Sequence, residues 1–220
     1  IYLQKFYSQT LKENDVCITF DDNLRCQYDI ALPVLNSLKL KAFWFIYSIP
    51  LDGGFDKLET YRNFRSSKFN SFHEFYDDFF SELQRHEKYK FVFEALIDFN
   101  YDNYLNEFSF YSKEDKIFRY TRDHLLGEKS YYKVMDLLFK KFNFSLTPEL
   151  HKSLWMNSED IKKLSSEGHI IGLHSHTHPT RMGEKSYTFQ YENYKKNKTI
   201  LESVIKDKVK SMSHPCNSYN

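Results

Sequence analysis

The chain has 220 residues, which is enough for one sizeable domain with a substantial buried core. Its 31 Lys and Arg against 30 Asp and Glu give a formal net charge of +1, so it has no broad positive field for binding nucleic acid or an anionic membrane. Three widely spaced cysteines without a CxxC pair, and no apolar run near the roughly 18 residues that span a bilayer, favour a reducing, cytoplasmic location.

The first predicted elements are a strand, a helix and a second strand. Residues 15–20 form a short β-prone run that ends in Asp21-Asp22, so two carboxylates follow a buried strand. Residues 41–46 predict another buried strand. Residues 28–40, between them, predict an amphipathic helix with the apolar residues Ile30, Leu32, Val34, Leu35 and Leu38. This order predicts a parallel βαβ unit with a right-handed crossover.

The middle of the chain has a different pattern. From about residue 51 to 150 it is rich in Phe, Tyr, Lys and Asp, with helices expected at 72–84 and 130–142. We interpret residues 51–150 as a helical insertion in a single domain, 1–220, whose barrel segments are residues 1–50 and 151–220. The insertion is also a candidate contact surface for a homo-oligomer.

The parallel pattern resumes in the last third of the chain. Asn157 is a predicted N-cap, with Asp160 at the third position of the following helix. The strand predicted at residues 169–173 carries a histidine cluster at its C-terminal end, which is the same sheet edge as the paired aspartates. A helix from about residue 191 to 205 and a last strand at 209–213 complete the pattern.

The histidine cluster and the paired aspartates together suggest a metal site. His174 and His178 are four residues apart, which lets both imidazoles face one side of a helical turn or tight loop. Neutral imidazole suits Zn²⁺, and one carboxylate of Asp21-Asp22 would complete a two-His, one-Asp set with a position open for water. The second carboxylate can take a proton from that water. Taken alone, the histidine cluster would fit a solvated loop as well as a metal site, and the Asp pair would equally fit a solvated turn or a helix N-cap.

Two segments resemble signature motifs of a known family. Thr19-Phe-Asp-Asp22 and His174-Ser-His-Thr-His178-Pro are similar to the first two motifs of the polysaccharide deacetylases, also called carbohydrate esterase family four or the NodB-homology group. The resemblance covers roughly residues 15–50 and 155–220. It implies an α/β fold, specifically an irregular (β/α) barrel of the NodB-like type with a helical insertion, and a natural chain that continues past Asn220.

The resemblance also assigns roles to the site residues. It implies that Asp21 is the general base and that Asp22, His174 and His178 bind a divalent metal ion, with Zn²⁺ expected first and Co²⁺ or Ni²⁺ as alternatives. The implied reaction removes an N-linked acetyl or similar acyl group from an amino sugar or polysaccharide.

The third motif departs from the family pattern. The family usually has an Arg two residues before a Pro and an aromatic residue after it, whereas this chain has Ser213-His-Pro-Cys-Asn217. The resemblance places Pro215, Cys216 and Asn217 at the substrate, with the Cys216 N–H as an oxyanion donor.

Two further positions differ. Asn23 stands where a Gly commonly follows the second Asp. The late histidine that serves the family as general acid has no counterpart before Asn220, and His176 and His214 are the alternatives within the chain.

Two other functions stay open. A His-x-His pair also begins the metal sites of amidohydrolase and polymerase-histidinol-phosphatase-like barrels acting on small molecules, but there it belongs to the first strand, whereas here it lies far along the chain. The other alternative is a degenerate barrel that binds its ligands without turnover, which the altered third motif keeps open.

Overall fold

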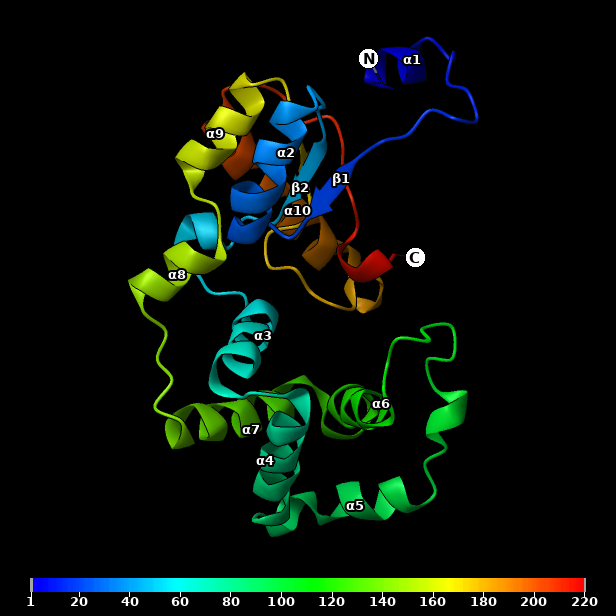
Figure 1. Ribbon diagram of the computed structural model, residues 1–220, viewed down its shortest axis with the longest axis vertical. Helices are drawn as coiled ribbons and strands as arrows, with labels where there is room; N and C mark the ends of the chain where they lie inside the picture. The colour runs from blue at the N-terminus through cyan, green and yellow to red at the C-terminus, as the bar shows by residue number, and fades with distance from the viewer. Residues whose placement is uncertain (1, 220) are drawn as a thin grey trace. The chain divides into compact units, whose positions relative to one another are not determined.

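The computed structural model describes residues 2–219, which form two compact units (Figure 1). Unit 1 comprises Ile1–Asp56 and Thr147–Asn220, and unit 2 comprises Lys57–Leu146. The organisation of one domain with an insertion at 51–150 stays a prediction.

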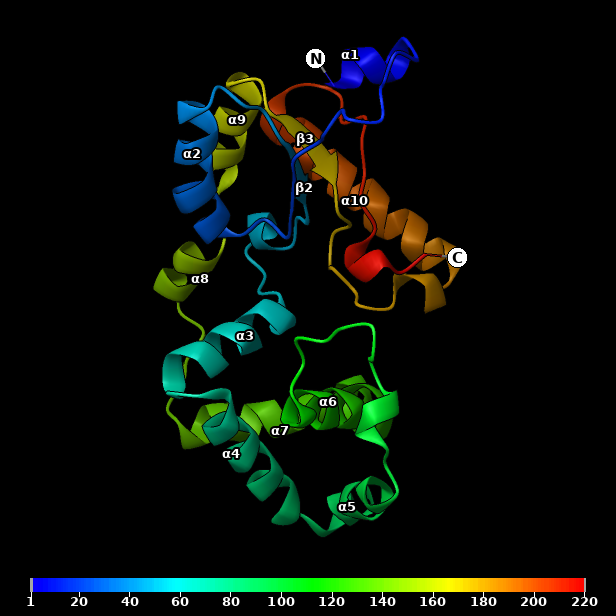
Figure 2. The same ribbon diagram turned by 45° about the vertical axis from the view of Figure 1, so that its right-hand side comes forward.

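Unit 1 contains a parallel three-stranded sheet in the order β1-β2-β3 (Figures 1 and 2). The strands are β1 (Thr19–Asp21), β2 (Phe43–Ile46) and β3 (Ile170–Leu173). Asp21 pairs with Phe45, so the carboxyl ends of the strands share one edge. The predicted α/β class with parallel pairing is confirmed, whereas the described residues form this sheet rather than a complete barrel.

The prediction of a last strand at residues 209–213 is wrong. The structure has a single parallel bridge there, between Leu173 and Met212. Backbone hydrogen bonds of 2.9 Å flank it, from Leu173 N to the Ser211 carbonyl and from Ser213 N to the Leu173 carbonyl. Pairing stops because a 3₁₀ turn begins at Pro215, which has no N–H to extend a ladder.

The helix predicted at 28–40 has two parts, a π-helical turn at Gln27–Ala31 and α2 (Leu32–Ser37). Of the five apolar residues of this predicted helix, only Leu32 and Leu35 are buried. The others form a separate i, i+4, i+8 stripe on the opposite side, and a helix can turn only one stripe toward the sheet. These exposed residues are Ile30, Val34 and Leu38.

The helices around the sheet begin at defined caps. Helix α9 (Ser158–Ser166) starts with the predicted capping box, in which Asn157 and Asp160 each accept the other's backbone N–H. Helix α10 (Tyr187–Ile205) starts one turn before the predicted residue 191, because Ser186 caps it. The two other helices of this unit are α1 (Tyr2–Tyr7) and α8 (Pro148–Leu154).

The main core of unit 1 joins the sheet to α2, α9 and α10. Trp44 of β2 is 1% exposed and shares this core with residues from each helix. The helical members are Leu32, Leu35, Ile161, Leu164 and Leu201. Packing of these side chains on parallel strands fixes where the strand ends and their loops lie.

Unit 2 is helical. Its helices are α3 (Lys57–Lys68), α4 (Phe72–Gln84), α5 (Lys90–Ile97), α6 (Lys113–Tyr120) and α7 (Gly127–Lys141). The helix predicted at 72–84 is confirmed residue for residue, and the one predicted at 130–142 corresponds to α7. The aromatic residues of this unit build its core, in which Phe64, Phe79 and Leu138 are fully buried.

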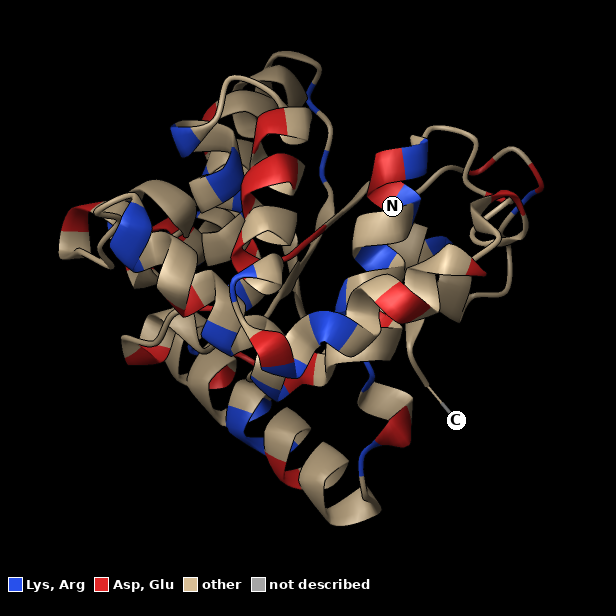
Figure 3. Ribbon diagram, turned by 90° about the horizontal axis from the view of Figure 1, so that it is seen from below, with Lys and Arg blue, Asp and Glu red and all other residues tan. Residues whose placement is uncertain are grey.

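The charged residues of both units are mixed in sign. Figure 3 shows Lys and Arg interspersed with Asp and Glu along the helices, in keeping with the net charge of +1. Among residues 2–219, no helix is both long enough and apolar enough to cross a membrane.

Replacing Phe79 with Ala should lower the free energy of unfolding by about 3–5 kcal/mol, because it opens a cavity in the core of unit 2. Phe79 is 0% exposed and its ring lies among those of Phe75, Phe118 and Tyr131. Urea denaturation followed by circular dichroism measures the loss. The control is Phe91→Ala, at a ring that is 45% exposed, and equal losses in the two variants would contradict the assigned core.

Candidate metal centre

The three predicted metal ligands meet at the carboxyl edge of the sheet. Asp22 directly follows β1, and His174 directly follows β3. Asp22 Oδ1 lies 3.2 Å from His174 Nε2 and 3.0 Å from His178 Nε2. One ligand atom from each residue lies within 4.8 Å of the other two. This donor set fits a small divalent cation that accepts imidazole and carboxylate ligands.

The ligands converge because the backbone turns sharply at both of their loops. Asp22 and Asn23 have φ angles of 81° and 59°, and Ser175 and His178 have φ angles of 64° and 49°. In an extended strand, Asp22 would point away from Asp21, and the left-handed turn redirects it. Such conformations typically cost about 1–3 kcal/mol each and gather at functional sites.

Asn197 of α10 joins the histidine loop to the neighbouring strand. Its side chain is 0% exposed. Asn197 Oδ1 accepts the N–H of His174 at 3.1 Å, while its Nδ2 donates to the Ile46 carbonyl at 2.9 Å. One carboxamide therefore satisfies two backbone groups just where β2 and β3 end.

Asn193, one helical turn earlier in α10, binds the histidine loop at two further backbone groups. Its Oδ1 accepts the backbone N–H groups of His176 at 2.6 Å and of Thr177 at 3.1 Å. Neither asparagine was predicted as a site residue. A signal was present, because Asn193, Asn197 and the buried Leu201 form an i, i+4, i+8 stripe that faces the protein interior.

His174 and His178 are each held in orientation by a neighbouring group that is not a predicted ligand. His174 Nδ1–H donates to the Ser213 carbonyl at 2.9 Å, so Nε2 is the ring nitrogen that faces Asp22. The His178 ring stacks on Tyr47, with ring centroids 4.8 Å apart. The Tyr47 hydroxyl in turn accepts a 2.5 Å hydrogen bond from Trp155 Nε1. These contacts fix the orientation of both imidazoles without an ion.

The charge state of Asp22 suits a metal ligand. Burial favours its protonated form, but the hydrogen bonds from His174 and His178 outweigh burial and hold the pKa of Asp22 well below its usual range. Asp22 is therefore ionised at neutral pH, as a metal-binding carboxylate must be.

Asp21 lies beside the ligand group rather than within it. Its side chain is 43% exposed, and its Oδ2 is 4.0 Å from His174 Nε2. The same Oδ2 accepts a hydrogen bond of 3.3 Å from the Ser213 hydroxyl. The role of Asp21 as general base stays a prediction, and the structure places its carboxylate within reach of both solvent and the ligand group.

The predicted substrate-binding residues form the 3₁₀ turn Pro215–Asn217. Pro215 is buried, while Cys216 and Asn217 are exposed and have left-handed φ angles of 52° and 51°. The turn begins two residues after Ser213, which contacts both Asp21 and His174. Its role at the substrate stays a prediction.

The two candidate general acids face other partners. His176 Nδ1 lies 3.0 Å from the Ser48 hydroxyl and its Nε2 lies 4.0 Å from Asp52 Oδ2. Burial lowers the pKa of His176. His214 Nδ1 lies 3.0 Å from the Tyr194 hydroxyl. Burial raises the pKa of Tyr194 to about 12.

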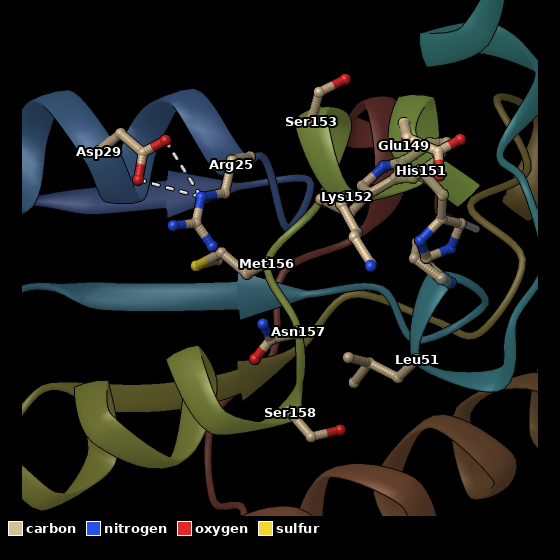
Figure 4. A pocket seen from close by; sticks show the side chains of 12 residues that line it. Arg25, Asp29, Leu51, Glu149, His151, Lys152, Ser153, Met156, Asn157 and Ser158 are labelled. Carbon is tan, nitrogen blue, oxygen red and sulfur yellow. Dashed lines mark hydrogen bonds and ion pairs between the residues drawn. The ribbon is translucent and has the colours of Figure 1, made fainter. Parts of the chain in front are cut away.

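A pocket of about 730 Å³ in unit 1 (Figure 4) is not lined by any of the three predicted metal ligands. Arg25 lines it and is already paired with Asp29 at 3.0 Å. Trp155 also lines it and is the residue that bonds to Tyr47. The pocket therefore borders Trp155, which holds the Tyr47 ring that stacks on His178, and it does not contain the candidate metal centre.

Residues 121–220 match the family model described as polysaccharide deacetylase, a range that includes His174 and His178. The match confirms the resemblance to the polysaccharide deacetylases that the motifs predict. A search of curated proteins found no match.

Two solved structures are similar to the chain. One is the Streptococcus pyogenes deacetylase PplD in complex with acetate, at 12% identity and a TM-score of 0.51, covering 100% of this chain and 54% of that one. The other is a mutant of BA3943, a CE4 family pseudoenzyme with restored enzymatic activity, at 13% identity and a TM-score of 0.42. That match covers 96% of this chain and 44% of the other. The chain thus spans about half the length of these proteins.

Replacing Asn197 with Leu should lower the free energy of unfolding by about 2–4 kcal/mol, because it leaves the His174 N–H and the Ile46 carbonyl without partners. Zinc affinity should fall by about 10–100-fold, the usual cost of losing a supporting hydrogen bond behind a ligand. Urea denaturation and zinc titration measure the two effects. Ser203→Ala, on the exposed side of the same helix, should change neither quantity; unchanged zinc affinity in Asn197→Leu would contradict the role.

Replacing His178 with Ala should remove bound zinc, because only Asp22 and His174 would remain as ligands. Elemental analysis of the purified, zinc-loaded proteins should find about one zinc per wild-type chain. His176→Gln is the control, since His176 faces Ser48 and Asp52. Equal zinc in His178→Ala and the wild type would show that His178 is not a ligand.

Proposed function

We propose that the chain is a metal-dependent hydrolase that removes N-linked acetyl or similar acyl groups from an amino sugar or polysaccharide. The observation that carries the proposal is the meeting of Asp22, His174 and His178 within 4.8 Å, beside the separate and more exposed carboxylate of Asp21. The family match over residues 121–220 supports the deacetylase class.

Asp22, His174 and His178 would hold the divalent ion, with Zn²⁺ expected first and Co²⁺ or Ni²⁺ as alternatives. The donor set fits this ion because both imidazoles turn Nε2 toward an ionised carboxylate. A divalent ion at such a site polarises the amide carbonyl and acidifies water.

Asp21 accepts the proton of the attacking water. Ser213 engages Oδ2 of this carboxylate, and Oδ1 has no hydrogen-bond partner among residues 2–219. The side chain is 43% exposed, so water reaches it, and it is 4.0 Å from a metal-binding imidazole. These features support a role for Asp21 in accepting a proton from water at the ligand group without serving as a ligand itself.

The turn at Pro215–Asn217 binds the acyl end of the substrate. A backbone donor such as the Cys216 N–H, aimed at the developing oxyanion, typically lowers the barrier by about 2.7–4 kcal/mol. The departing amine needs a proton. Of the two candidate acids, His214 fits better, because it directly precedes this turn, while His176 is turned toward Ser48 and Asp52.

Replacing Asp21 with Asn should leave zinc bound and reduce acetate release by about 10²–10⁴-fold, because the amide cannot accept the proton. The assay is acetate release from an N-acetylated chito-oligosaccharide by zinc-loaded protein. The control is Asp29→Asn, which alters a carboxylate that is paired with Arg25 instead.

Two outcomes would count against the proposal. Full activity in Asp21→Asn would exclude Asp21 as the base. A zinc-loaded wild type that releases no acetate from N-acetyl sugars would favour a binding protein that retains the ligands without turnover.

A further inference from the structure

Ser213 lies where three parts of the candidate site meet. Its N–H donates to the Leu173 carbonyl at 2.9 Å, which holds it beside the end of β3. Its carbonyl accepts the Nδ1–H of His174 at 2.9 Å. Its hydroxyl donates to Asp21 Oδ2 at 3.3 Å. One residue thus contacts a metal-binding imidazole and the carboxylate that is not a ligand.

We propose that Ser213 is a positioning residue that fixes the carboxylate of Asp21 relative to His174. The inference rests on the proposed function, in which Asp21 is the base. Ser213 acts through Asp21 and is not itself a reacting group.

The Ser213 hydroxyl is the main constraint on Asp21. Within residues 2–219, the next partner of the Asp21 carboxylate after Ser213 is His174 Nε2, at 4.0 Å. No Lys or Arg in the described part of the chain pairs with it. A half-exposed Asp side chain rotates easily, and a single donor on Oδ2 is enough to select one orientation. A neutral hydroxyl thereby directs Oδ1 without adding a charge.

The backbone and side chain of Ser213 have separate effects. The backbone bonds to Leu173 and His174 survive any substitution that keeps the main chain in place, so the tautomer of His174 is preserved. The hydroxyl contributes only to Asp21. Ser213→Ala should therefore leave zinc affinity unchanged while it releases the carboxylate.

The neighbouring Ser211 offers a matched control. It lies two residues earlier in the same segment, and its carbonyl likewise bonds to the end of β3. Its buried hydroxyl has no hydrogen-bond partner among the residues described. Ser211→Ala therefore removes the same atom from the same segment without touching Asp21.

The first test is kinetic, with zinc-loaded protein and an N-acetylated chito-oligosaccharide. Ser213→Ala should lower kcat by about 10–100-fold, the loss expected for a hydrogen bond to a charged group, with KM and zinc affinity unchanged. Ser213→Thr, which keeps the hydroxyl, should recover most of kcat, and Ser211→Ala should match the wild type. A fall in zinc affinity in Ser213→Ala, or no recovery in Ser213→Thr, would overturn the proposal.

The second test needs no substrate. Crystal structures of the zinc-loaded wild type and of Ser213→Ala should show Asp21 in one orientation in the wild type, and rotated or divided between orientations in the variant. The same single orientation in both would overturn the proposal. If the wild type releases no acetate, the proposed function fails, and the two crystal structures still decide whether Ser213 positions Asp21.

Discussion

The loop from His174 to His178 begins at the buried end of β3, where its backbone N–H groups need hydrogen-bond partners. Two side chains of α10 supply them, through the carboxamides of Asn193 and Asn197. A buried N–H without a partner costs about 1–3 kcal/mol, so the loop follows the path that these side chains allow. Because both predicted metal-binding histidines lie on that path, the spacing of the three predicted ligands depends on a helix that contributes none of them.

The parts of the structure that could be predicted depend on short-range signals. Paired aspartates after a β-prone run, and a histidine after another, had to meet at one edge because parallel strands place their carboxyl ends together. The Asn157 capping box and the bounds of α4 likewise depend on neighbouring residues. The convergence of Asp22 with His174 and His178 was therefore accessible from the sequence.

The parts that could not be predicted depend on residues far apart in the chain. Residues 28–40 contain two apolar stripes, and only packing on the sheet decides that Leu32 and Leu35 are the ones buried. Nothing near Ser213 indicates that its hydroxyl reaches Asp21 or that its carbonyl reaches His174. The same holds for the final strand, whose β-prone residues form one bridge because the turn at Pro215 ends the pairing.

The backbone conformation at Asn23 explains why this position can carry either Asn or Gly. Its φ angle of 59° is left-handed, a conformation that Gly adopts freely and that Asn tolerates better than most other residues. The Gly common in the family and the Asn of this chain thus meet one requirement of the main chain. The main-chain conformation therefore permits both residue types, whereas a β-branched residue would be strained there. A departure from a family motif is informative only once the conformation that the position demands is known.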